Sequence, residues 1–402
     1  MLYIDCGHTA AGPHYTGIQR YVRHTLRHAH ALLGADAVRA LAAGPGGWTC
    51  LPRLPGHPLE GLPPLELRGG TPRFDGNTHV LLADRFWHTG AWDALDSLLA
   101  SPARISVVVY DLLSMQQPEW FDQGVGARFG RYLRRVLPRA DRIVCLSSAV
   151  AAELAAWMAA QRIAGAGAGA GAGAAISVVP PGHRVWHGEP EAPPGLPAAW
   201  VDGRTPFVLQ VGTVEPRKNH ALTLAAVQRL WDRGADIGCL FIGQRGWLMQ
   251  SFGEALARLP QWQRQLRWLT ECPDAQLEWC YRHAAAVVYP SAGEGYGLPL
   301  AEAACAGAAV VASDTPVHRE VRHRLPPGAT VTLCAAEAAA VGRALQAALA
   351  EHRPARGRGP GRDWRAATDE LLASLGLRGR SRSDQVEHAV LDRPDHVGLV
   401  LG

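Results

Sequence analysis

The sequence predicts an α/β protein built from two doubly wound, Rossmann-like domains that face each other across a cleft. Two patterns along the chain support this fold class. Short apolar runs rich in β-branched residues alternate with longer amphipathic stretches, which favours βαβ units whose parallel strands are buried on both faces. A Pro-rich segment, Glu189–Pro197, separates these runs into two sets, and its prolines exclude a helix or a central strand.

Each apolar run is expected to form a strand. The expected strands of the first set are Leu2–Asp5, Val38–Ala42, His79–Ala83, Ile105–Tyr110, Arg142–Leu146 and Ile176–Val179. The expected strands of the second set are Phe207–Val211, Gly238–Ile242, Leu266–Thr270, Ala286–Tyr289, Ala309–Ala312 and Thr330–Leu333. Helices are expected at Ala149–Arg162 and around Trp364–Leu375.

The two sets of strands define the expected domains. We expect an N-terminal domain at residues 1–190, a linker at 191–204 and a C-terminal domain at 205–360, with a helix at 364–376 packing back on the N-terminal domain. In open α/β sheets, ligands bind beyond the carboxyl ends of the strands, so two facing sheet edges predict a binding cleft.

Two further segments offer few side chains to a packed core. The Gly-Ala alternation at residues 164–175 is expected to be a surface loop, because glycine and alanine have little to bury. Residues 378–402 are expected to form a weakly ordered tail.

The composition limits the class of protein. The chain has 402 residues, of which 48% are hydrophobic and 19% charged, so it can bury a sizeable core; its net charge of +4 is too small to indicate a nucleic-acid-binding protein. Eight cysteines without a Cys-x-x-Cys pair predict reduced, buried thiols in a cytoplasmic protein. Neither a signal peptide nor a run of about 18 apolar residues is recognisable, so no transmembrane helix is expected.

The potential metal ligands do not form a recognisable pattern. Seventeen histidines include no His-Glu-x-x-His spacing, and no Asp-x-Asp occurs. We therefore expect no bound metal and no other cofactor.

The segment at residues 289–303, YPSAGEGYGLPLAEA, predicts a phosphate and sugar site. Its three glycines permit sharp turns and close backbone approach, and Pro299 suits the first turn of a helix whose N-terminal amides could bind a phosphate. Glu302 is expected in that first turn and Glu294 in the loop, eight residues earlier, so the two carboxylates could hold two ends of one ligand. The alternatives are that Glu302 only complements the helix dipole and that Glu294 is a solvated loop acid.

The segment at residues 207–219, FVLQVGTVEPRKN, predicts a diphosphate site. A strand ends before Gly212, and the loop that follows contains Arg217 and Lys218, which suit a diphosphate as a bidentate fork and a mobile point charge. Lys218 is the single lysine of the sequence, all other basic residues being arginine, so its presence here indicates a specific use. The alternative is a solvated basic turn.

Together these two segments resemble glycosyltransferase family 4, the retaining transferases with the GT-B fold, and in particular its bacterial mannosyltransferase-like members. GEGYGLPLAEA is similar to the Glu-x7-Glu signature of that family and VGTVEPRKN to its diphosphate-binding loop. Three shorter segments also fit the resemblance, which covers roughly residues 1–375: FIGQRGW at 241–247, VVASDTPVHRE at 310–320 and YTGIQRY at 15–21.

The resemblance implies roles for individual residues. Arg217 and Lys218 would neutralise the departing nucleoside diphosphate, Glu302 would bind ribose hydroxyls, and Glu294 would contact hydroxyls of the donor sugar. Gly17 would let the N-terminal domain approach the diphosphate from the other side. The remaining residues expected at the donor are Gly212, Gly295, Tyr296, Gly297 and Leu298.

One position departs from the family pattern. Many members have His-Asp or His-Glu where this chain has Tyr110-Asp111, and that histidine contacts the donor sugar. Tyr110 can donate a hydrogen bond but is no imidazole, so Asp111 is taken as the catalytic candidate of the N-terminal domain. The alternative for Asp111 is an acid that caps a turn at a strand end.

The expected partners follow from these residues: a GDP-, UDP- or dTDP-sugar donor, a glycan or lipid-linked saccharide acceptor, and no nucleic acid. Spacings of three and four place each of two arginine trios on one helix face, which could contact an anionic inner membrane or simply be solvated. These trios are Arg20, Arg23 and Arg27, and Arg128, Arg131 and Arg135.

The function that the sequence predicts is hexosyl transfer in surface polysaccharide biosynthesis. Two alternatives remain open at this stage: a non-catalytic protein that binds sugar nucleotides, and a phosphorylase or epimerase built on a similar pair of domains.

Overall fold

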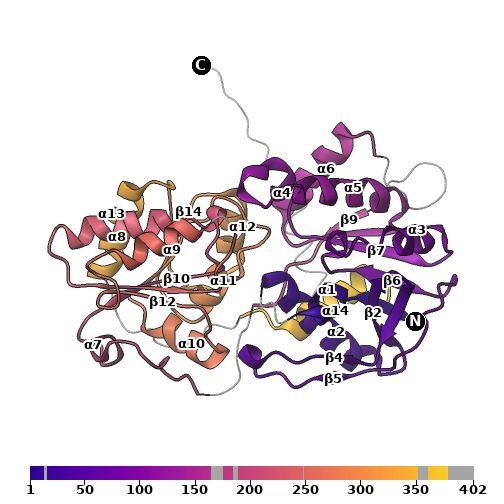
Figure 1. Cartoon of the computed structure of the whole chain (residues 1–402), viewed down its shortest axis with the longest axis horizontal. Helices are drawn as coiled ribbons and strands as arrows, with labels where there is room; N and C mark the ends of the chain where they lie inside the picture. Colours follow the sequence, from indigo (N-terminus) through magenta and orange to yellow (C-terminus); the bar gives the residue numbers. More distant parts are fainter. Residues whose placement is uncertain (13–15, 164–174, 184–188, 248, 352–360, 379–402) are drawn as a thin grey trace.

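The computed structural model describes residues 1–12, 16–163, 175–183, 189–247, 249–351 and 361–378 of the chain. Two α/β domains lie side by side (Figure 1). The surface loop predicted at 164–175 falls outside the described residues except for Ala175, and the tail predicted at 378–402 falls outside them except for Arg378.

The N-terminal domain contains a seven-stranded sheet in the order β3-β2-β1-β6-β7-β8-β9. All neighbouring strands are parallel except β2 and β3, which form an antiparallel hairpin. The strands are β1 (Leu2–Asp5), β2 (Val38–Gly44), β3 (Gly47–Leu51), β6 (His79–Leu82), β7 (Arg104–Val109), β8 (Arg142–Cys145) and β9 (Ala175–Val178), with a separate ribbon of β4 (Arg53–Leu54) and β5 (Leu65–Glu66).

Helices cover both faces of this sheet. The α-helices of the domain are α1 (Gly7–Ala11), α2 (Gly17–Leu33), α3 (Trp92–Ala100), α4 (Leu113–Gln116), α5 (Val125–Val136) and α6 (Ser148–Ala160). Four 3₁₀ turns accompany them: η1 (Pro58–Glu60), η2 (Phe86–His88), η3 (Pro118–Trp120) and η4 (Leu137–Arg139). Because strand side chains alternate between faces, Ile4 enters one core and Tyr3 the other.

The C-terminal domain contains six parallel strands in the order β12-β11-β10-β13-β14-β15. They are β10 (Phe207–Val211), β11 (Gly238–Ile242), β12 (Leu266–Leu269), β13 (Ala286–Tyr289), β14 (Val310–Ser313) and β15 (Val331–Cys334). The helices of this domain are α8 (His220–Trp231), α9 (Gln250–Ala257), α10 (Asp274–His283), α11 (Leu298–Cys305), α12 (Pro316–Arg324) and α13 (Ala338–Ala350), with a 3₁₀ turn, η5, at Pro216–Lys218.

The predicted doubly wound α/β fold is confirmed, and each predicted strand coincides with an observed one to within two residues at either end. The hairpin strand β3 was not predicted. It follows the segment AGPGG, whose proline and glycines obscure the apolar pattern, and Gly47 turns the chain with a φ of 98°.

Strand order places the ligand-binding edge. β10 lies between β11 and β13, so the chain first continues to one side of β10 and later crosses to the other side. β1 has the same position between β2 and β6. Such a switch point leaves a crevice at the carboxyl ends of the strands.

The C-terminal segment returns to the N-terminal domain. Helix α14 (Trp364–Ser374) packs beside α2, where the rings of Trp364 and His24 stack with their centroids 4.5 Å apart (Figure 1). Gly182 makes this approach possible, since a Cβ there would lie 2.5 Å from the backbone of Trp364.

The segment predicted as linker contains structure of its own. Residues 189–197, all of them described, contain neither helix nor strand, as predicted, but Ala198–Val201 form a short helix, α7. Trp200 from this helix is buried and stacks on Phe207 of β10 with ring centroids 5.5 Å apart. This end of the linker therefore belongs to the core of the C-terminal domain.

Polar contacts join the two domains. The carboxylate of Glu320 in α12 accepts hydrogen bonds from the amides of Ser148 and Ala149, at 2.8 and 3.1 Å, and so caps the N-terminus of α6. Nearby, the hydroxyl of Ser147 donates to the carbonyl of Gly295 at 2.9 Å. The sheet edges of the two domains are thereby held facing each other.

The burial of Trp200 predicts a large effect on stability. We expect Trp200→Ala to lower the free energy of unfolding by about 3–5 kcal/mol, because it removes a buried aromatic ring and leaves a cavity. Val201→Ala, which changes an exposed neighbour on the same short helix, is the control and should change it by no more than about 0.5 kcal/mol. Urea unfolding followed by circular dichroism measures both, and equal losses in the two variants would refute the assignment of Trp200 to the core.

Candidate active site

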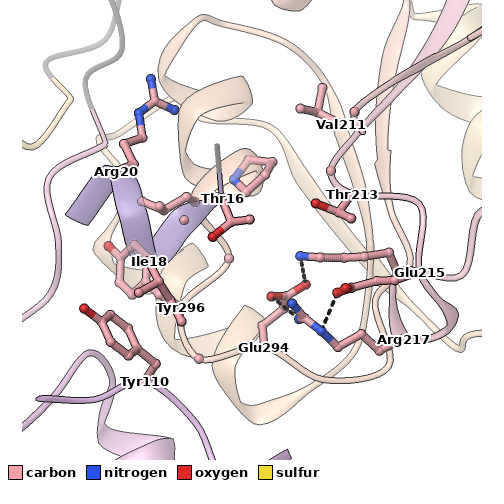
Figure 2. Close-up of a pocket in the computed structure, with 18 of the residues that line it drawn as sticks. Thr16, Ile18, Arg20, Tyr110, Val211, Thr213, Glu215, Arg217, Glu294 and Tyr296 are labelled. Carbon is pink, nitrogen blue, oxygen red and sulfur yellow. Dashed lines mark hydrogen bonds and ion pairs between the residues drawn. The ribbon is translucent and has the colours of Figure 1, made fainter. Parts of the chain in front are cut away.

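A cavity of about 330 Å³ lies between the two domains and is lined by both. Every residue that the sequence nominated for the site contributes to its wall: Gly17, Asp111, Gly212, Arg217, Lys218, Glu294, Gly295, Tyr296, Gly297, Leu298 and Glu302. Residues nearly 300 positions apart in the chain therefore surround one space, as Figure 2 shows for the labelled members.

The two sequence motifs meet because their strands are neighbours. β10 and β13 are paired and parallel, so the loops that follow them leave the sheet side by side. The loop after β10 supplies Arg217 and Lys218, and the loop after β13 supplies Glu294. A backbone hydrogen bond from the amide of Ala292 to the carbonyl of Arg217, at 2.8 Å, joins the loops directly.

Glu294 is the centre of a buried ionic cluster. Its Oε1 accepts hydrogen bonds from Lys218 Nζ at 2.5 Å and from the Tyr289 hydroxyl at 2.8 Å, while its Oε2 accepts from Arg217 Nη1 at 2.9 Å. Arg217 Nε lies 2.6 Å from Glu215 Oε1 on its other side (Figure 2). Glu294 is only 8% exposed, so the alternative of a solvated loop acid is wrong.

Burial and charge oppose each other at these groups. Burial alone would raise the pKa of Glu294, but Lys218 and Arg217 outweigh it and hold that pKa far below its ordinary value. Burial lowers the pKa of Lys218, against the opposing effect of Glu294. For Glu215 burial prevails over the neighbouring cations, and its pKa is raised.

Glycines allow the loop after β13 to press against the N-terminal domain. A Cβ on Gly295 would lie 2.0 Å from the carbonyl oxygen of Tyr110, and one on Gly293 would lie 2.7 Å from the Leu113 side chain. Gly297 has a φ of 93°, in the left-handed region, and immediately precedes α11. A side chain at Gly295 would therefore collide with the backbone of the other domain, whereas one at Gly293 would displace the Leu113 side chain.

The N-termini of two helices point at the cavity from opposite domains. Gly17 begins α2 and Leu298 begins α11, and the Cβ position of Gly17 is 3.5 Å from Leu298 Cδ1. Free amides and the positive end of the helix dipole at such termini favour an anion. The geometry therefore suits a phosphate group held between two helices.

Glu302 occupies a different place from the one predicted. It is the fifth residue of α11 and so lies beyond the first turn, which contains no acidic residue. The side chain is buried; Oε1 accepts from Arg20 Nη1 at 2.9 Å and Oε2 from the Tyr281 hydroxyl at 3.1 Å. Its role as a mere complement to the helix dipole is not supported, because the carboxylate binds side chains from other helices.

Tyr110 stands where many members of the resembled family have histidine, and its hydroxyl is hydrogen-bonded to the backbone. The ring of Tyr110 lines the cavity, but its hydroxyl donates to the carbonyl of Ala83 at 2.6 Å. Asp111 Oδ1 accepts from the amide of Leu113 at 3.0 Å, which is the turn-capping contact considered as the alternative. Burial raises the pKa of Asp111, while Arg217 lowers it. Asp111 therefore caps a turn and also faces the cavity.

The arginine trio on α2 does not form an exposed basic face. Arg20 is 6% exposed and Arg23 is 4% exposed, so this trio can neither be solvated nor contact a membrane as a unit. Arg20 instead binds Glu302 and Asp274 of the C-terminal domain. In the second trio, Arg128, Arg131 and Arg135 of α5 are exposed.

Sequence reasoning missed several residues of the site. Glu215 stands in the quoted diphosphate motif, and its position two residues before Arg217 was the available signal. Tyr289 was read only as a strand end, although the last residue of a parallel strand borders the cavity. Asp274 and Tyr281 had no signal in the sequence, and Arg20 was interpreted only as part of a basic helix face, because their contacts join helices from distant parts of the chain.

The described residues contain no candidate for a metal site or for a membrane-spanning helix. No group of three or more His, Cys, Asp or Glu side chains is arranged there to hold a metal ion. No described helix is both long and apolar enough to span a membrane.

Comparison with known proteins finds a family match for most of the C-terminal domain. The family model described as glycosyl transferases group 1 matches residues 200–352, which include Arg217, Lys218, Glu294 and Glu302. This part of the chain is therefore similar to a glycosyltransferase group 1 domain. The resemblance expected from the two motifs is thus confirmed.

The curated proteins that the chain is similar to include mannosyltransferases. The serotype-specific mannosyltransferase WbdA of Escherichia coli is 35% identical over 229 residues, which are 56% of this chain and 28% of that protein. The phosphatidyl-myo-inositol mannosyltransferase of Mycolicibacterium smegmatis is 36% identical over 124 residues, 30% of each protein. The chain therefore matches less than a third of the length of these relatives.

Solved structures show the fold of the whole chain. The sucrose-phosphate synthase of Thermosynechococcus elongatus superposes with a TM-score of 0.61 at 17% identity, over 97% of this chain and 98% of that one. Anabaena Alr3699/HepE, in complex with UDP and glucose, gives a TM-score of 0.58 at 12% identity, over 98% and 99%. Both Rossmann-like domains and their arrangement therefore constitute the GT-B fold, as expected.

The ionic cluster predicts a pH-dependent contribution to stability. We expect Glu294→Gln to lower the free energy of unfolding by about 3–5 kcal/mol at neutral pH, because it leaves two buried cations without their carboxylate. Since folding lowers the pKa of Glu294, the wild-type advantage is fully present above the ordinary value of 4.5 and declines as the pH falls below it.

Urea unfolding at pH 4 to 8 measures this difference. Asp314→Asn, in an exposed ion pair with Arg319, is the control and should leave stability unchanged. A Glu294→Gln variant as stable as the wild type at pH 7 would contradict the assigned cluster.

Proposed function

We propose that the protein is a retaining hexosyltransferase that transfers a sugar from a nucleotide donor to a glycan or lipid-linked saccharide in surface polysaccharide biosynthesis. The observation that supports this most directly is the meeting of Arg217, Lys218 and Glu294 in one interdomain cavity. Mannose is the favoured sugar, because WbdA and the phosphatidyl-myo-inositol mannosyltransferase are both mannosyltransferases.

The donor diphosphate would be held by charge and by helix amides. Arg217 and Lys218 lie within reach of the cavity, and the N-termini of α2 and α11 open into it from both domains. Cleavage of the sugar–phosphate bond places negative charge on the leaving diphosphate and positive charge on the sugar ring. Cations fixed in advance around the diphosphate lower the free energy of that charge separation.

Glu294 would change partners when the donor binds. In the structure Glu294 forms ion pairs with Arg217 and Lys218, so an incoming diphosphate must compete with its carboxylate for these two cations. Once displaced from part of these contacts, the carboxylate can accept hydrogen bonds from hydroxyls of the donor sugar. This exchange would keep every buried charge paired before and after binding.

Glu302 would bind the ribose, and Asp111 would face the reacting sugar. Glu302 lies one turn inside α11, beyond the amides assigned to the phosphates. Asp111 reaches the cavity from the N-terminal domain and interacts with Arg217 across it. We assign Asp111 rather than Tyr110 to the donor sugar because the hydroxyl of Tyr110 is bound to the Ala83 carbonyl.

A transfer assay tests the proposal. The protein, incubated with UDP-, GDP- or dTDP-hexose and a saccharide or lipid-linked acceptor, should transfer sugar from one donor, with no loss of rate in a chelator because side chains supply the positive charge. Lys218→Ala should lower kcat/KM by about 10²–10³, the effect of removing one fixed donor to the developing charge. Asp111→Asn should lower kcat while leaving nucleotide affinity unchanged.

Binding measurements distinguish this proposal from a second candidate, a non-catalytic protein that binds sugar nucleotides. The engagement of the Tyr110 hydroxyl by Ala83 is the observation in favour of that candidate. Both candidates require Lys218→Ala and Glu302→Ala to weaken binding of the preferred nucleotide, whereas Arg319→Ala should not. Binding without turnover would select the second candidate, and undiminished affinity in both site variants would remove the donor site altogether.

Contact with an anionic membrane is proposed only for α5. Arg128, Arg131 and Arg135 are exposed on this helix, and the guanidinium groups of Arg131 and Arg135 lie 5.8 and 5.4 Å from the centre of the Trp92 ring. A basic face next to an aromatic ring suits the surface of a bilayer that contains anionic lipids.

Vesicle sedimentation tests this contact. The protein should bind vesicles containing phosphatidylglycerol more tightly than pure phosphatidylcholine, and replacing the three α5 arginines by glutamine should weaken binding by about fivefold per residue. Glutamine at Arg233, Arg258 and Arg264, which are exposed on the C-terminal domain, is the matched control. Equal effects of the two triple variants would leave α5 without a specific role.

A further inference from the structure

Arg20 connects the two domains through buried ion pairs. Its side chain belongs to α2 of the N-terminal domain, yet Nη1 donates to Glu302 Oε1 and Nη2 to Asp274 Oδ2, each at 2.9 Å. The three side chains are between 2% and 8% exposed. One guanidinium fork thus bridges two carboxylates from α11 and α10 of the opposite domain.

Glu302 is consequently held from both sides of the interface. Tyr281, from its own domain, donates to Oε2, while Arg20, from the other domain, donates to Oε1. Burial raises the pKa of Glu302, Asp274 raises it further, and Arg20 counteracts both. Removal of Arg20 would therefore take away the guanidinium that Glu302 and Asp274 share.

The position of Arg20 on α2 relates this contact to the donor. The amide of Arg20 donates to the carbonyl of Thr16, so Arg20 lies in the first turn of the helix whose N-terminus borders the cavity. Gly17 and Arg20 are separated by about 4.5 Å of helix rise. One turn of α2 therefore presents amides to the proposed diphosphate site and a guanidinium to the proposed ribose site. Figure 2 shows Thr16, Ile18 and Arg20 along this turn.

We infer that Arg20 is a positioning residue for nucleotide recognition, which holds Glu302 from the opposite domain in the orientation that binds the ribose hydroxyls. Glu302 would then bind the ribose hydroxyls in this orientation only while the two domains are in contact through Arg20. The inference rests on the proposed function, because it assigns the ribose to Glu302. It adds that recognition of the nucleoside depends on an N-terminal residue that does not belong to the C-terminal motifs.

A purely structural clasp is the competing explanation. If Arg20 only holds the domains together, its removal should weaken all ligands of the cavity equally, whether or not they have ribose hydroxyls. If it acts through Glu302, its removal should weaken only those ligands that have them. The ratio of affinities for two ligands that differ in the ribose therefore separates the explanations.

Calorimetric titration of the full chain measures this ratio. The probes are UDP or GDP, whichever the wild type binds more tightly, and its 2′,3′-dideoxy form; for a protein that binds only dTDP, the second probe is the 3′-deoxy form. The wild type should prefer the hydroxylated probe by about 10–100-fold, the value of hydrogen bonds to a charged group. Arg20→Ala and Glu302→Gln should each abolish most of that preference.

The double variant and the controls complete the test. Because Arg20 is inferred to act through Glu302, Arg20→Ala in the Glu302→Gln background should change the ratio no further. Arg20→Lys, which keeps the charge but lacks the planar fork, should retain part of the preference and serves if Arg20→Ala does not fold. Arg319→Ala, in an exposed ion pair, should leave the ratio unchanged.

The outcomes separate the inference from the proposed function. Absence of nucleotide binding by the wild type would overturn both. Binding by the wild type with no preference for the hydroxylated probe, or with a preference that survives in the Arg20 variants, would overturn the inference and leave the donor site in place. So would effects of Arg20→Ala and Glu302→Gln that add in the double variant.

Discussion

The structure depends on the requirement that every charge buried between the domains has a partner. Arg217 and Lys218 line the cavity with Glu294 between them, and an unpaired charge at any of these buried positions would cost several kcal/mol. The ion pairs of Glu294 with Arg217 and Lys218 therefore help to keep the loops after β10 and β13 together. Those loops in turn shape the cavity wall that the C-terminal domain contributes.

Sheet topology supplies the proximity that this cluster needs. Parallel pairing of β10 with β13 brings two loops together whose motifs are separated by about 80 residues in the chain. The N-terminal domain forms the opposite wall of the cavity, because Gly295 permits close contact with the carbonyl of Tyr110. Backbone geometry thus determines which groups meet. The strand order brings the two loops to one sheet edge, and the lack of a side chain at Gly295 allows the N-terminal domain to approach them closely.

The sequence was sufficient for the strands, the two domains and the residues of the two motifs, because each leaves a local pattern: an apolar run, a Pro-rich break, or a glycine loop with charge. It was insufficient where the outcome depends on which surfaces meet. Helical spacing placed Arg20 and Arg23 on one face of α2 but could not show that the C-terminal domain covers this face. Trp200 was assigned to a linker for the same reason, since only the packed sheet shows that Phe207 lies beneath it. The hydroxyl of Tyr110 is a further case, because its partner, Ala83, belongs to another strand end.

The distribution of charge limits how a nucleotide sugar could bind. Among the described residues that line the cavity, four are cationic (Arg20, Arg85, Arg217 and Lys218) and four are carboxylates (Asp111, Glu215, Glu294 and Glu302). Three of the four cations, Arg20, Arg217 and Lys218, already bind carboxylates before any ligand enters. A diphosphate that binds Arg217 and Lys218 must therefore take them over from Glu294, and the carboxylate it releases needs new donors, which sugar hydroxyls can provide. On the proposed function, diphosphate binding and sugar recognition are consequently coupled through Glu294, because the sugar hydroxyls complete the exchange of partners that the diphosphate begins.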